Sequence, residues 1–176
     1  ERCFALAAGY GGRRHTVEPM PELALAGLGA VDDPLRALVY ESVTDGCQLE
    51  DFNADVAARC AAVCEEPVTR ALLEQIAREE RSHADFSWAL VEWVLGAHPA
   101  RARAAMERAL ADLAGYPRPT AVSGDKRALV ARADEAALRR HGRLRDEEWA
   151  EAWTARLGET RRRIEALLGA AARRAA

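Results

Sequence analysis

The chain has 176 residues, a formal net charge of −3 and 30% charged residues. Alanine and leucine dominate its 49% apolar content, and only 6% of the residues are aromatic, a composition that favours helices and excludes an all-β fold or a disordered chain. No apolar run reaches the ~18 residues that cross a bilayer. The acidic balance gives no reason to expect a nucleic-acid partner, because phosphate binding needs a basic surface.

The first predicted element is a short helix that ends at a pair of glycines. Residues 1–12 begin with the apolar pattern ERCFALAAGY and stop at Gly11 and Gly12. Because no capping residue precedes this pattern, we expect residues 1–12 to be the end of a truncated, longer helix. Residues 13–33 are rich in proline and glycine and are predicted to form an irregular connection. It ends at Pro34, a residue type common in the first turn of a helix.

Residues 34–97 are predicted to form a pair of long antiparallel helices. Apolar residues return every three or four positions over about 35–64 and again over about 67–95. Gly46 interrupts the first helix at a cost of roughly 1 kcal/mol relative to alanine, unless a neighbouring group needs the space beside it. This helix pair carries the candidate functional residues.

Residues 98–176 are predicted to add further helices that pack on the bundle. We expect a helix over about 100–114, a turn-rich segment at 116–120, a helix capped by Asp125 that runs to about Arg140, a break at His141 and Gly142, and a last helix from Asp146 to about Leu168. The whole chain is therefore predicted to be one all-α domain, a helical bundle.

The four cysteines favour a reducing compartment. Cys3, Cys47, Cys60 and Cys64 contain no CxxC pair, and the spacing of these residues is wrong for a zinc site. At this chain length a disulfide-stapled secreted domain is also disfavoured. We therefore predict a cytoplasmic protein in which these thiols are small packing residues.

Three side chains of the helix pair carry the candidate chemistry. Glu80 and His83 are three positions apart and therefore adjacent on one helix face, and Glu50 is expected on the buried stripe of the preceding helix. Two carboxylates and an imidazole in an apolar interior need a compensating cation. Carboxylate oxygens with one imidazole nitrogen suit iron or manganese. The alternative is a solvated Glu–Arg–His surface that binds no metal, since a lone Glu-x-x-His motif is weak evidence.

Three segments of the chain resemble ferritin-like, carboxylate-bridged diiron proteins. They are DGCQLE at 45–50, IAREERSHADFSW at 76–88 and HGRLRDEEW at 141–149, and they are most similar to a group of bacterial ferritin-like domain proteins of unassigned function. The resemblance implies a ferritin-like bundle with additional C-terminal helices, in which Glu50 bridges two metals and Glu80 and His83 are the Glu-x-x-His pair. It also places Glu79 at the acidic position before that pair and Trp88 at the tryptophan position after it.

The resemblance further implies a non-haem diiron (or iron/manganese) oxidoreductase that uses O2 to oxidise an unidentified small organic substrate. The family pattern of Glu followed by Glu-x-x-His occurs twice in a complete site but once in this chain. We therefore expect the remaining ligands upstream of Glu1 or in a second copy of the chain, which would make a homodimer. Trp88, and Cys47 one turn before Glu50, are candidates to line the pocket. The alternatives are iron binding or detoxification without an organic substrate, and a metal-free scaffold or partner-binding module.

Overall fold

The computed structural model describes residues 2–12, 32–120, 122 and 124–175, and this part of the chain is helical without strands, which confirms the all-α prediction. The helices are α1 (Arg2–Gly11), α2 (Pro34–Glu41), η2 (Ser42–Glu50), α3 (Asp51–Val63), α4 (Pro67–Ala97), α5 (Pro99–Asp112), η3 (Leu113–Gly115), α6 (Gly124–Val130), α7 (Glu135–Arg140) and α8 (Asp146–Ala175). Apart from Asp32 and Asp33, the predicted irregular connection lies outside the described residues.

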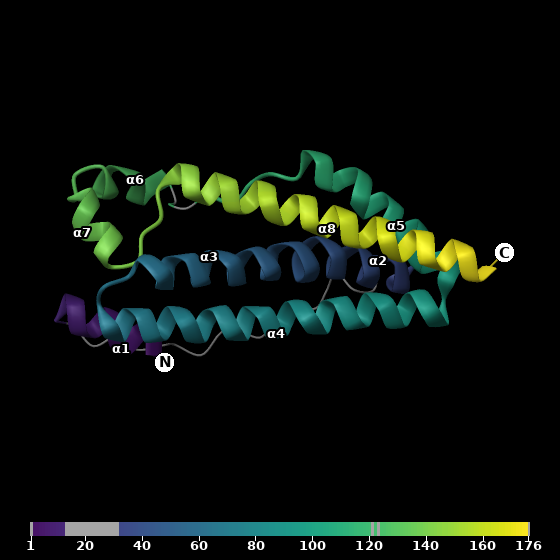
Figure 1. Ribbon diagram of the computed structural model, residues 1–176, viewed down its shortest axis with the longest axis horizontal. Helices are drawn as coiled ribbons and strands as arrows, with labels where there is room; N and C mark the ends of the chain where they lie inside the picture. The colour runs from purple at the N-terminus through teal and green to yellow at the C-terminus, as the bar shows by residue number, and fades with distance from the viewer. Residues whose placement is uncertain (1, 13–31, 121, 123, 176) are drawn as a thin grey trace.

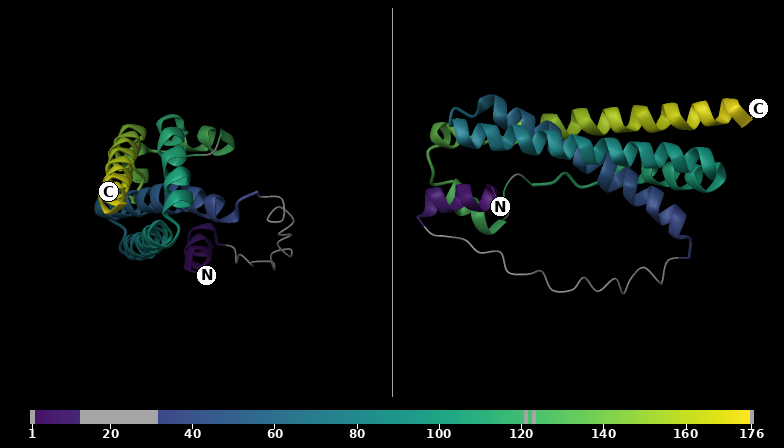
Figure 2. Two further views of the ribbon diagram at one scale, coloured as in Figure 1. Left: turned by 90° about the vertical axis from the view of Figure 1, so that its right-hand side faces the viewer. Right: turned by 90° about the horizontal axis from the view of Figure 1, so that it is seen from below.

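The bundle is built around one composite rod. Helices α2, η2 and α3 follow one another without a break and run antiparallel to α4, while α8 and α5 pack on the opposite side of the rod (Figure 1). Helix α1 lies beside the first half of α4, on the side away from α8 (Figure 2). The predicted antiparallel helix pair is thus confirmed. None of the described helices combines the length and the apolar character that a membrane crossing requires.

Local signals in the sequence explain where the two main helices begin. The Asp33 carboxylate accepts a hydrogen bond from the backbone N–H of Arg36, and Pro34 occupies the first turn of α2. Glu66 caps α4 in the same way, accepting from Val68 N at 3.2 Å and Thr69 N at 2.6 Å. These bonds satisfy backbone donors that have no partner within the helix. They also hold the pKa of Glu66 below its usual range.

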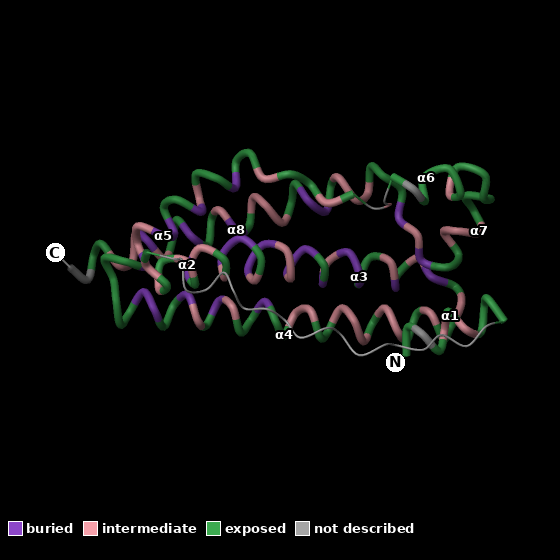
Figure 3. Tube along the Cα trace, turned by 180° about the vertical axis from the view of Figure 1, so that it is seen from behind, coloured by how far each residue is buried: buried purple, intermediate pink, exposed green. Residues whose placement is uncertain are grey.

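The apolar core follows the rod and has two parts. The larger part joins η2, α4, α5 and α8 through residues such as Val43, Val91, Met106 and Ile164. The smaller part lies between α3 and the start of α8, where the Phe52 ring meets the edges of Trp149 and Trp153 at centroid distances of 5.3 and 5.0 Å. Burial is accordingly concentrated on η2, α3 and the inner face of α4 (Figure 3).

Two predicted helices differ from the structure. The segment from Asp125 to Arg140 is two short helices, because a turn at 131–134 separates α6 from α7. Asp134 caps α7, accepting from Ala137 N at 2.6 Å, and α6 begins at Gly124, one residue before the predicted start at Asp125. The last helix also extends beyond the predicted end at Leu168, to Ala175.

The first helix of the predicted pair changes its winding at Ser42–Glu50, where it is a π-helix. Such segments carry i→i+5 hydrogen bonds and occur frequently at functional sites. Gly46 lies within this segment because α4 passes close to it: a Cβ at Gly46 would stand 2.5 Å from Ser87 Cβ. Ser87 thus occupies the space beside Gly46. This agrees with the expectation that a glycine inside a helix makes room for a neighbouring group.

Gly46→Ala is therefore expected to lower the free energy of unfolding by about 1–3 kcal/mol, because two packed helices must separate to admit the methyl group. The matched control is Gly158→Ala in α8, where the nearest atom to an added Cβ is Arg162 Nη1 at 3.5 Å. That change should gain about 0.5–1 kcal/mol from helix propensity. Urea denaturation measures both, and equal stabilities of the two variants would contradict the close approach of α4 to Gly46.

Candidate metal centre

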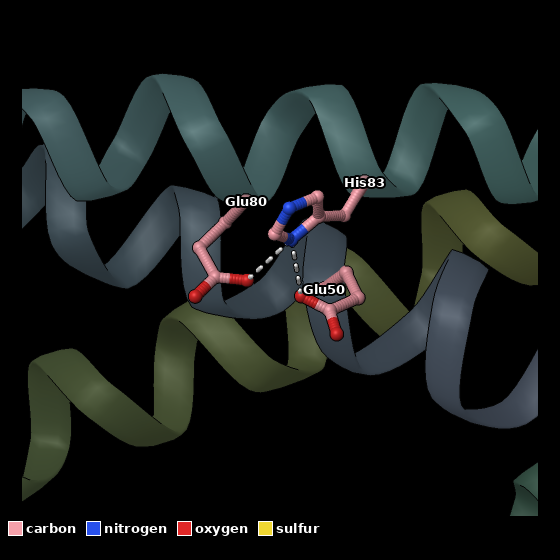
Figure 4. Close-up of side chains that lie close together, drawn as sticks. All are labelled: Glu50, Glu80 and His83. Atoms are coloured by element: carbon pink, nitrogen blue, oxygen red, sulfur yellow. Dashed lines mark ion pairs between the residues drawn. The ribbon is translucent and has the colours of Figure 1, made fainter.

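The three predicted ligands lie together although they come from two helices. Glu50 is the last residue of η2, and Glu80 and His83 lie in the middle of α4 (Figure 4). His83 Nδ1 is 3.6 Å from Glu50 Oε2 and 3.7 Å from Glu80 Oε2. One donor atom from each residue lies within 4.8 Å of the others. The antiparallel packing of η2 on α4 therefore brings side chains that are distant in sequence into one group of potential metal donors.

The cluster lies at the flank of the core instead of inside it. The buried seam of α4 is formed by residues 84, 88, 91 and 95, and Glu80 and His83 lie beside this seam. The side chains of Glu80 and Glu50 are 25% and 35% exposed, and that of His83 is 64% exposed. The prediction that all three groups face an apolar interior is therefore wrong for His83 and holds only in part for the carboxylates.

The proximity of the two carboxyl groups determines the electrostatics of the site. A hydrogen bond with Glu50 raises the pKa of Glu80 from 4.5 to about 7, assisted by partial burial and by repulsion from the Glu50 charge, while His83 acts in the opposite direction. Near neutral pH the Glu80 carboxyl group is thus partly protonated, because a like charge at this distance disfavours its ionisation. A bound cation would replace that proton and relieve the same repulsion.

This arrangement predicts how stability depends on pH. Because the folded-state pKa of Glu80 is raised, its contribution to stability is fully present below about pH 4.5 and is lost as the pH rises through about 7. The metal-free wild type should therefore lose more stability between pH 5 and pH 8 than Glu80→Gln, whose amide does not titrate. Urea denaturation in the presence of a chelator measures the difference. Parallel pH profiles of the two proteins would contradict the raised pKa of Glu80.

The other candidates for the site do not belong to the group of converging donor atoms. Glu79 is exposed and accepts a hydrogen bond from Gln75 Nε2 at 2.5 Å. Cys47 is fully buried in the larger core, and this burial raises the pKa of its thiol. Trp88 is 2% exposed and turns toward α3 and α8, with the Arg163 guanidinium 4.1 Å from its ring centroid. Cys47 and Trp88 are therefore core residues, and their place at a pocket stays a prediction.

Sequence reasoning missed a buried ion network directly behind the cluster. Asp51 follows Glu50 in the chain, is 6% exposed, and pairs with Arg81 of α4. Asp55 lies 2.6 Å from both Arg81 Nη2 and Arg156 Nη2. Trp88 Nε1 donates to Asp51 Oδ2 at 3.0 Å, and Arg156 Nη1 of α8 lies 3.4 Å from the same oxygen. Two aspartates, two arginines and an indole thus join α3, α4 and α8.

The network positions the backbone of both ligand-bearing segments. Asp51 follows Glu50 in the sequence, and Arg81 follows Glu80. Both partners of this ion pair are therefore sequence neighbours of candidate ligands. Opposite charges compensate one another within the network, which makes its burial tolerable. Among the described residues, neither carboxylate of the cluster pairs with an arginine. His83 is the ion-pair partner of both Glu50 and Glu80. The structure thus contains a charge-balanced network and, beside it in sequence, two carboxylates that pair with His83.

Comparison with known proteins adds no family to this geometry. No family model, curated protein or solved structure matches the chain. The ferritin-like resemblance therefore stays a prediction from three sequence segments. The case for a function consequently depends on the geometry of Glu50, Glu80 and His83.

Proposed function

We propose that Glu50, Glu80 and His83 bind a divalent iron or manganese ion. The observation that carries this proposal is the convergence of the three donor atoms within 4.8 Å. Distances of 3.6 and 3.7 Å from His83 Nδ1 to the two carboxylates are within about an ångström of the donor spacing around one octahedral cation. The mixture of carboxylate oxygens and one imidazole nitrogen fits iron and manganese.

Each residue has a role that its surroundings support. Glu80 would release its proton when the cation enters, since metal ligands bind in their deprotonated forms. Glu50 and Glu80 then supply the negative charge that neutralises the ion. His83, with its ring 64% exposed, faces the side from which ions and small molecules approach. Bound iron or manganese would supply redox chemistry with O2, the activity that the ferritin-like resemblance implies.

We further propose that a complete centre takes its remaining ligands from an N-terminal segment or from a second copy of the chain. In support, α1 approaches α4 close to the cluster: Arg2 donates a hydrogen bond to Gln75, and Gln75 donates to Glu79 beside Glu80. Helix α1 therefore points its N-terminal end along α4 toward the proposed ligands. The exposure of the His83 side chain, 64%, leaves this ligand accessible to a further chain segment.

The exposure of the cluster favours a second candidate function, the capture of iron without an organic substrate. An enclosed site protects reactive oxygen chemistry from water, whereas the His83 ring is 64% exposed. The two functions share the same residues and differ in the fate of the ion once it is bound. They are therefore separated by stoichiometry and by oxygen consumption.

The test is anaerobic loading of the purified chain with Fe(II), followed by elemental analysis and measurement of O2 uptake. About one iron per chain with O2 uptake that Glu80→Ala abolishes supports redox chemistry at this site. Iron far above that ratio supports storage or detoxification. Absence of bound iron and manganese, or equal metal content in the wild type and Glu80→Ala, would overturn the proposal and leave a helical scaffold.

A further inference from the structure

Helix α1 is held against α4 at its two ends. At one end Arg2 donates a hydrogen bond to Gln75 Oε1. At the other end the Tyr10 hydroxyl lies 3.3 Å from Thr69 Oγ1 and 3.0 Å from Nδ1 of His141, which ends α7. Polar contacts therefore hold both ends of α1 against its neighbours.

A cavity of about 700 Å³, open to solvent, lies between the middle turns of α1 and the start of α4. Its walls are small or apolar residues of α1 and α4, namely Ala5, Leu6, Gly9, Val68, Ala71 and Leu72. A Cβ at Gly9 would have no neighbouring atom within 4 Å, so the gap extends to the α1 backbone. Volume and lining match small-molecule sites, which are mostly apolar with a few polar groups at defined positions.

We propose that this cavity binds an apolar monocarboxylic acid. The apolar walls select a hydrocarbon or aromatic body, and Arg2 at the rim selects the acid group. The side chain that accepts from Arg2 is the neutral amide of Gln75, so a carboxylate would gain a charge-assisted hydrogen bond there. Glu66 is an acidic residue of the cavity lining. Its carboxylate accepts hydrogen bonds from the backbone at the start of α4 and does not neutralise Arg2.

Binding of the acid does not depend on binding of a metal. The cavity is lined by residues of α1, of the first turns of α4 and by His141, and none of them belongs to the Glu50, Glu80 and His83 cluster. Metal-free protein is therefore expected to bind the acid. A ligand seated under α1 would also lie along the same helix as the proposed metal ligands, with Gln75 between the two sites.

The experiment is calorimetric titration of the metal-free chain with decanoate, and with decanol as the uncharged probe of equal chain length. The wild type should bind decanoate about tenfold more tightly than decanol, and Arg2→Gln should remove this preference. Gly9→Phe fills the cavity and should weaken binding of both probes by at least about tenfold. Gly11→Phe is the matched control, because Gly11 lies on α1 outside the cavity lining.

Saturable decanoate binding that Gly9→Phe removes and Gly11→Phe retains supports the site. Circular dichroism of both variants checks that the helices are intact. No saturable binding of either probe, or equal binding by the wild type and Gly9→Phe, would overturn the proposal. Equal affinity of the wild type for decanoate and decanol would overturn the role of Arg2.

Discussion

Replacing Glu80 or His83 by alanine is expected to weaken Mn²⁺ binding about 100-fold or more. Residues that only support metal ligands already contribute 10–100-fold in affinity, and these two side chains provide two of the three proposed donors. Glu80→Ala also removes the carboxyl group whose pKa is raised by a hydrogen bond with Glu50, by partial burial and by the Glu50 charge, so the remaining acid has less need of a cation. Titration of metal-free protein with Mn²⁺, followed by the electron paramagnetic resonance of the free ion, gives the dissociation constants.

Glu79→Ala is the matched control for this prediction. Glu79 has the same charge and precedes Glu80 directly, but it is exposed and bonded to Gln75 instead of the cluster. Its replacement should change Mn²⁺ affinity by less than about twofold, the effect of one screened surface charge. Equal losses in Glu79→Ala and Glu80→Ala would indicate a diffuse acidic surface and contradict a three-residue centre.

Asp51→Ala is expected to lower the free energy of unfolding by about 3–5 kcal/mol, the range found when one partner of a buried ion pair is removed. Asp51 is 6% exposed, and its carboxylate receives Arg81, Arg156 and the Trp88 indole. The substitution leaves these donors without their shared acceptor. Urea denaturation at neutral pH, in the presence of a chelator, measures the loss.

The control for this loss is Glu107→Ala on α5. Glu107 pairs with Arg103 one helical turn away, and its side chain is 53% exposed. Surface pairs of this kind contribute about 0.3–0.5 kcal/mol, so the variant should be nearly as stable as the wild type. A loss below about 1 kcal/mol in Asp51→Ala would show that the network does not join α3, α4 and α8 in solution.

The sequence was most informative about helices whose ends are encoded locally. Asp33 with Pro34 and Glu66 with Pro67 combine a capping carboxylate with a proline in the first turn, and both start helices where expected. The segment between Asp125 and Arg140 was wrongly predicted as one helix because its break depends on the Asp134 cap. A capping residue in the middle of an apolar pattern is easily taken for a surface position of one continuous helix.

The orientation of the site residues could not be predicted, because it depends on the winding of η2. An α-helical wheel places Glu50 on the face of Cys47 and Ala54. In the wider π-helix each residue turns through a smaller angle, so the face that enters the core shifts along the chain. Asp51 is consequently buried, and Glu50 reaches only the flank.

The ion network was missed for a related reason. Its members lie far apart in sequence, on α3, α4 and α8, and only tertiary packing shows that Arg156 meets Asp51 and Asp55. The Glu-x-x-His spacing was a more useful signal, since it brings Glu80 and His83 together on one helix face whatever packs against it. The sequence thus predicted which residues form the cluster. It did not predict their exposure to solvent or the ion network next to them.

Crystallographic anomalous scattering from Mn²⁺-soaked crystals would show directly whether the three residues hold a cation. We expect one strong anomalous peak between η2 and α4, at about 2 Å from a carboxylate oxygen of Glu50, one of Glu80 and Nδ1 of His83. A peak at other residues would contradict the proposed centre. So would crystals of Mn²⁺-saturated protein with no anomalous peak between Glu50 and Glu80.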